Sequence, residues 1–97
     1  MLVFRKCEPE VVLQVACGII SGESYPQLEE SFRQAGFPIR EDEANFATIY
    51  VITFLTQKAR LLPEEVADFC DRTGVPMPRD VVLETVRQVL TGELKLE

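Results

Sequence analysis

Hydrophobic residues recur along the chain at helical spacing, in segments separated by glycine and proline. The most apolar run is residues 45–55, NFATIYVITFL. It follows three acidic residues, 41–43, and precedes Lys58 and Arg60, which is the order of charges that a helix dipole favours. Several β-branched residues in the run would favour a strand by propensity alone, but no other segment offers a good partner strand. We therefore predict a central buried helix over about 40–60.

Four further helices are predicted from turn residues and hydrophobic spacing. Their boundaries are marked by Pro9 and Gly22, by Ser24 and Gly36, by Pro63 and Gly74, and by Pro78 and Gly92. Proline suits the first turn of a helix, and glycine suits the left-handed residue that ends one. The prediction is an all-α fold, a compact bundle of about five short helices around the central apolar helix, in a single domain of residues 1–97.

The first predicted helix is apolar on almost every side, with Gln14 as the polar residue in its middle. A bundle of five helices can enclose one helix completely, and the central helix is the better candidate for that place. One face of the first helix is then left outside, and exposed apolar patches usually mark association sites. The residues predicted to form this interface are Val12, Val15, Ala16, Ile19 and Ile20. The alternative is that the two apolar helices pack against each other inside a monomeric core.

Charge argues against nucleic acid and anionic membranes as partners. The formal net charge is −6, and the ten basic residues are scattered, so no basic stripe forms. The central apolar run is also shorter than the roughly 20 residues that a helix needs to span a bilayer. The start of the chain does not read as a signal peptide, because Leu2 to Phe4 precede the basic residues instead of following them. A cytoplasmic protein is expected.

The chain contains no histidine, which removes the common nucleophile pairs and the histidine-based metal sites. Its three cysteines show no C-x-x-C spacing, so neither a disulfide framework nor a zinc site is indicated. No cofactor, metal or enzymatic activity is therefore expected. Cys7 is the candidate reactive thiol, because Arg5, Lys6 and the adjacent helix start would all favour a thiolate.

Three functions remain open. The first is a non-enzymatic module for protein–protein interaction or homo-oligomerisation, acting as a homodimer or by docking a partner helix. The second is a small-molecule sensor with a pocket between helices near Tyr50, Phe54 and Phe69. The third is a helix-turn-helix binder of nucleic acid, whose recognition helix would be 79–90 with Arg79 and Arg87 as its basic residues. The acidic charge disfavours this third function.

Overall fold

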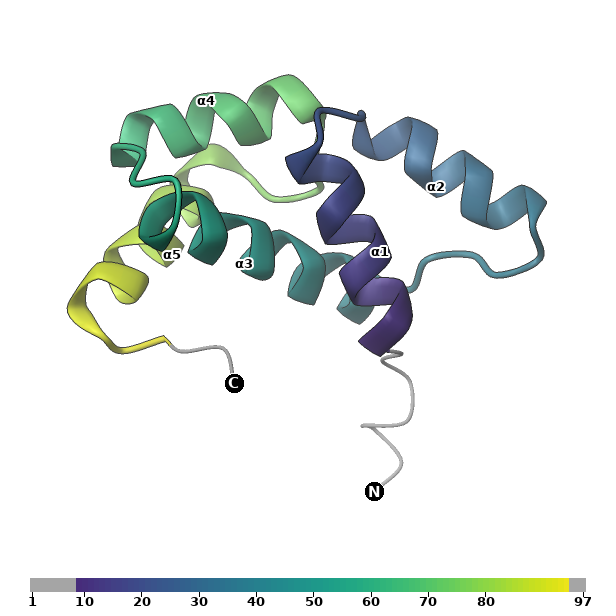
Figure 1. Cartoon of the computed structure of the whole chain (residues 1–97), viewed down its shortest axis with the longest axis horizontal. Coiled ribbons are helices and arrows are strands. Elements are labelled where there is room, and N and C mark those ends of the chain that lie inside the picture. Colours follow the sequence, from purple (N-terminus) through teal and green to yellow (C-terminus); the bar gives the residue numbers. More distant parts are fainter. Residues whose placement is uncertain (1–8, 95–97) are drawn as a thin grey trace.

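The longest helix is α3, and α1, α4 and α5 lie along it, while α2 is set to one side (Figure 1). The structure is a computed structural model that describes residues 9–94. It confirms the all-α class. Within the described residues the helices are α1 (Pro9–Ile20), α2 (Tyr25–Gln34), α3 (Glu41–Gln57), α4 (Pro63–Thr73) and α5 (Arg79–Thr91).

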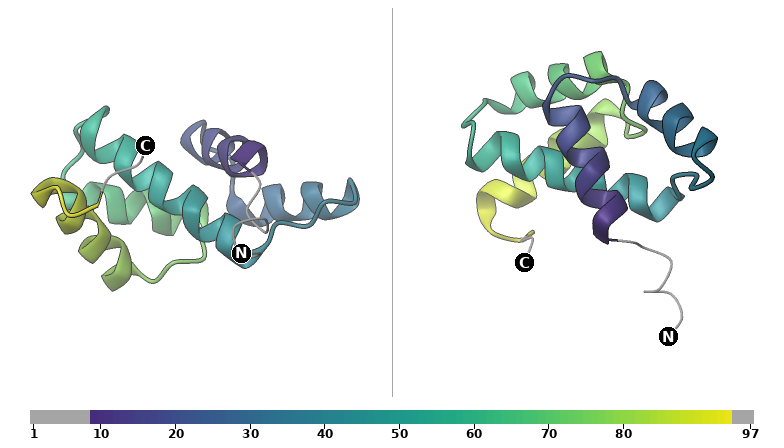
Figure 2. Two further views of the ribbon diagram at one scale, coloured as in Figure 1. Left: turned by 90° about the horizontal axis from the view of Figure 1, so that it is seen from below. Right: turned by 45° about the vertical axis from the view of Figure 1, so that its right-hand side comes forward.

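Helix α3 packs against α1, α4 and α5, while α2 packs against α1, and α4 packs against α5. Seen from below, α1 and α5 lie on opposite sides of α3 (Figure 2). The radius of gyration is 13.0 Å, close to the roughly 12.5 Å expected for a compact chain of this length. The described chain is therefore a compact helical fold.

The β-branched residues of α3 are compatible with a helix because their side chains form hydrogen bonds or pack in the core. The hydroxyls of Thr48 and Thr53 each donate a hydrogen bond of 2.8 Å to the carbonyl four residues earlier. Val51 and Ile52 are fully buried, so the packing of one face stabilises the helix where propensity does not. At its start, the Glu43 carboxylate accepts a hydrogen bond of 2.9 Å from the backbone N–H of Arg40.

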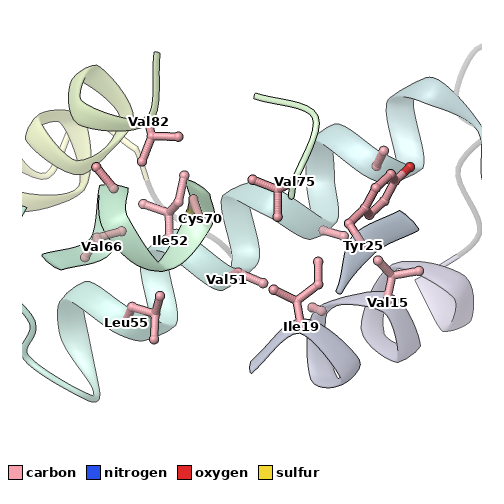
Figure 3. Close-up of a cluster of buried hydrophobic side chains, with 14 of the residues drawn as sticks. Val15, Ile19, Tyr25, Val51, Ile52, Leu55, Val66, Cys70, Val75 and Val82 are labelled. Carbon is pink, nitrogen blue, oxygen red and sulfur yellow. The ribbon is translucent and has the colours of Figure 1, made fainter. Parts of the chain in front are cut away.

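The core lies along one side of α3 and joins two groups of side chains (Figure 3). Val51 faces the group contributed by α1 and α2, and Ile52 faces the group contributed by α4 and α5. The labelled members of the two groups are Val15, Ile19 and Tyr25, and Val66, Cys70 and Val82. Because Val51 and Ile52 are adjacent, α3 makes the core continuous from one end of the protein to the other.

The end of α3 differs from the sequence expectation. The helix was expected to reach about residue 60, but it ends at Gln57. The chain then reverses through Arg60, which adopts a φ of +58°. Glycine usually occupies this left-handed conformation, but here an arginine does, so the sequence has no glycine to mark this helix end.

Candidate interaction surface

One side of α3 is not covered by the other helices. Phe46, Tyr50 and Phe54 are spaced four residues apart, which places them along the same side of the helix. Their exposed fractions are 48%, 36% and 37%. The expectation that the bundle encloses the central helix completely is therefore not met. We call these three residues the aromatic row.

The aromatic row lies in a part of the sequence without charge. The ten basic and sixteen acidic residues are absent from two stretches, 11–22 and 44–57, which form most of α1 and α3. These two helices pack against each other. On α1, Leu13 is 45% exposed and adds a large apolar side chain to this pair of helices.

The other helices carry ion pairs on their surfaces. Arg79 of α5 lies 2.9 Å from Asp68 and 2.6 Å from Asp71, both on α4. Arg87 pairs with Glu84 at 2.6 Å, within α5. The two arginines that a recognition helix would offer to nucleic acid are thus already paired with acidic groups. The charged surface of α4 and α5 contrasts with the uncharged surface of α1 and α3.

The structure places the five predicted interface residues mostly inside the chain. Val15, Ala16 and Ile19 are fully buried against the rest of the protein, and Val12 and Ile20 are half-buried. Fully buried side chains offer no surface to a partner, so these three belong to the core. The two apolar helices pack against each other, while the predicted homodimer stays a prediction.

The aromatic row was not among the predicted interface residues, although its spacing is visible in the sequence. Aromatics at 46, 50 and 54 recur every four residues, the spacing of one helix face. In the sequence prediction, Tyr50 and Phe54 instead lie near a ligand pocket between helices. What the sequence lacked was the information on which side of α3 the other helices would lie.

The cysteines lie in different environments. Cys7 falls outside the described residues, so the prediction of a reactive thiol there stays a prediction. Cys17 on α1 is exposed, and Cys70 on α4 is buried. Burial, and to a lesser degree the nearby Asp71 carboxylate, raises the pKa of the Cys70 thiol from about 9.0 to about 11. Cys70 is therefore a protonated core side chain at neutral pH.

Three cavities in the described part of the chain lie away from the predicted ligand pocket, which stays a prediction. None of the three is lined by Tyr50, Phe54 or Phe69. Phe69 instead stacks beneath Arg72, whose guanidinium carbon lies 5.3 Å from the ring centre. Residues 9–94 also contain no group of three or more metal-ligating side chains placed to hold an ion.

None of the helices between residues 9 and 94 is both long and apolar enough to cross a membrane. Comparisons with protein-family models, curated proteins and solved structures gave no match. The function is therefore inferred from the geometry and chemistry of this chain alone.

Proposed function

We propose that this protein is a non-enzymatic interaction module that forms a homodimer through the exposed sides of α1 and α3. The observation that carries the proposal is the aromatic row, Phe46, Tyr50 and Phe54, at the surface of an uncharged pair of helices. Large aromatic side chains are enriched in protein interfaces, where they contribute much of the binding energy. Leu13 of α1 would extend the contact beyond the row.

A second copy is the favoured partner because of charge. A two-fold axis brings a surface onto the same surface of the other copy, so a patch with a net charge meets a patch with the same net charge. The chain carries a net charge of −6, but none of that charge comes from 11–22 or 44–57. This pair of helices is therefore a surface on which two copies could meet without bringing like charges together.

The exposed area indicates a weak dimer. At roughly 200 Å² per aromatic side chain, exposed fractions of 48%, 36% and 37% leave about 240 Å² of aromatic surface. Covering that area contributes about 6 kcal/mol per copy, or about 12 kcal/mol per dimer, which is comparable with the cost of association, about 4–15 kcal/mol. Dissociation is therefore expected within the range of an ordinary dilution series.

The test is the mass in solution by light scattering, from low micromolar to several hundred micromolar protein. The Phe46→Glu variant places a charge in the row and is expected to remain monomeric at every concentration. Phe37→Glu is the matched control, because Phe37 is 68% exposed but lies in the α2–α3 loop. A parent protein that stays monomeric throughout, or a control that dissociates the dimer equally well, would contradict the proposal.

The proposal includes a cytoplasmic location and the absence of catalytic activity. Both are supported by the chain's chemistry: it has no histidine, and its cysteines show no disulfide spacing. Fractionation of cells expressing a tagged chain would test the location directly.

A further inference from the structure

A cavity of about 510 Å³ lies where α2, the start of α3 and the α4–α5 turn meet. This volume lies within the usual range of small-molecule sites, roughly 300–1,000 Å³. The turn lies close to α2: a Cβ added at Gly74 would lie only 3.1 Å from Pro26 Cδ. The cavity is thus framed by backbone that is held in place on both sides.

Tyr25, the first residue of α2, supplies an unpartnered hydroxyl to this cavity. Its side chain lines the cavity and is only 7% exposed. The hydroxyl makes no hydrogen bond with any described residue. Among these residues, Thr56 Oγ1 is the one side-chain polar atom that is both closed off from solvent and unpartnered. The Tyr25 hydroxyl is therefore reached by solvent from the cavity, where a ligand could replace water as its hydrogen-bond partner.

The cavity wall carries charges of both signs. Glu29 and Glu41 contribute carboxylates, and Arg40 contributes a guanidinium. Burial, and to a lesser degree the Glu29 carboxylate, raises the pKa of the Tyr25 phenol above its ordinary value of 10.0. The phenol is therefore neutral at physiological pH and lies within electrostatic reach of Glu29. An ammonium group could bind both the Glu29 carboxylate and the phenol oxygen.

The same wall also has groups that could bind a ligand carboxylate. Arg40 carries a planar guanidinium, a group that binds carboxylates through paired N–H donors. Asn45 adds a side-chain amide, and α3 begins at Glu41, so the positive end of the helix dipole lies beside Arg40. A ligand with only a negative charge would meet two carboxylates, and one with only a positive charge would meet the guanidinium.

We infer that this cavity binds a small zwitterion, a free amino acid with an apolar side chain. The ammonium group would lie at Tyr25 and Glu29, and the carboxylate at Arg40 and the start of α3. The rest of the wall is apolar and would receive the side chain; it includes Pro26, Ile39 and Pro76. This site is independent of the proposed homodimer, so the failure of either proposal leaves the other standing.

The experiment uses L-leucine as the probe, with two analogues that each lack one charge. 3-Methylbutylamine lacks the carboxylate, and 4-methylpentanoate lacks the ammonium group. Binding is followed by NMR of protein labelled with ¹³C-tyrosine, since the chain has only two tyrosines. Leucine is expected to shift the ring signals of Tyr25 but not those of Tyr50, and each analogue is expected to bind at least tenfold more weakly.

Tyr25→Phe is the decisive variant, because it removes a hydroxyl that has no protein partner and keeps the ring. It should fold normally and bind leucine about tenfold more weakly, the effect of one lost hydrogen bond. Tyr50→Phe is the matched control and should bind as the parent does. If Tyr25→Phe fails to fold, Glu29→Gln serves instead, with the same expected loss. Equal binding by the variant, no leucine binding at millimolar concentration, or equal binding of either analogue would overturn the inference.

Discussion

The hydroxyl of Thr56 provides a sharp test of the packing of α3. Its oxygen is closed off from solvent and has no hydrogen-bond partner, and the residue is only 7% exposed. A buried hydroxyl without a partner costs about 1–3 kcal/mol. Thr56→Val replaces that hydroxyl with a methyl group of similar size. The variant is therefore expected to be more stable than the parent, by about 1–2 kcal/mol.

Thr48→Val is the matched control, in the same helix and with the same atoms exchanged. The Thr48 hydroxyl is buried as well, but it donates a hydrogen bond of 2.8 Å to the Ala44 carbonyl. Removing that bond is expected to lower the free energy of unfolding by about 0.5–1 kcal/mol. The same substitution should thus have opposite signs at two positions of one helix.

Urea unfolding followed by circular dichroism measures both effects. With a slope of about 1–3 kcal/mol per molar urea for a small protein, Thr56→Val should raise the unfolding midpoint by roughly 0.5 M. An unchanged slope would show that the change lies in stability and not in the compactness of either state. A Thr56→Val protein that is no more stable than the parent, or a Thr48→Val protein that gains as much, would refute the reasoning.

Four further predictions concern the turns, the cysteines and the core. Gly74→Ala should destabilise the protein more than Gly92→Ala. Both substitutions incur the left-handed penalty of about 1–2 kcal/mol, but only the Cβ added at Gly74 also comes close to a proline ring. The midpoints of thermal unfolding of the two variants measure the difference. The thiol of Cys17 should react with a maleimide in the folded protein while Cys70 stays protected, which mass spectrometry of digested samples would detect. The raised Cys70 pKa also predicts stability that is complete below about pH 9 and declines up to about pH 11, a decline that should be weaker in Cys70→Ala. Ile52→Asp should unfold the protein, since Ile52 is fully buried and an unpaired buried carboxylate costs several kcal/mol. A normal melting curve for this variant would contradict the burial of Ile52 in the core.

The helix boundaries show what the sequence could predict. Ser24 was recognised as a helix cap, and its hydroxyl accepts a hydrogen bond of 3.3 Å from the backbone N–H of Gln27. Gly74 and Gly92 were recognised as helix ends, and both adopt positive φ. These features depend on the conformational preferences of single residues. The reversal after α3 uses Arg60, a residue without such a preference, so no local pattern predicts it.

Two helices are followed by the sequence Gly-x-Pro, and they show what local sequence patterns cannot predict. Both Gly36 and Gly74 end helices with positive φ, and each is followed by an apolar residue, which at such helix ends frequently packs back on the helix. Val75 does so and is only 9% exposed, but Phe37 is 68% exposed. Whether such a residue is covered depends on which distant segment lies beside it, which no local pattern records.

The candidate sites were predictable to different degrees. The apolar character of α1 and α3 and the absence of charge in both helices can be read directly from the sequence. The side of each helix that faces outward cannot, because it depends on where the remaining helices pack. The Tyr25 cavity had no sequence signal, since its wall combines the first turns of α2, the start of α3 with the residues before it, and the α4–α5 turn.

The attachment of α2 has a consequence for local unfolding. Only two of its ten residues, Tyr25 and Leu28, are buried, and its main contacts are with α1. Segments with few buried apolar contacts open at a lower free energy than the whole protein. The backbone amides of α2 are therefore expected to exchange with deuterium sooner than those of α3. A molecule that links Tyr25 to the start of α3 would hold α2 in place and slow that exchange.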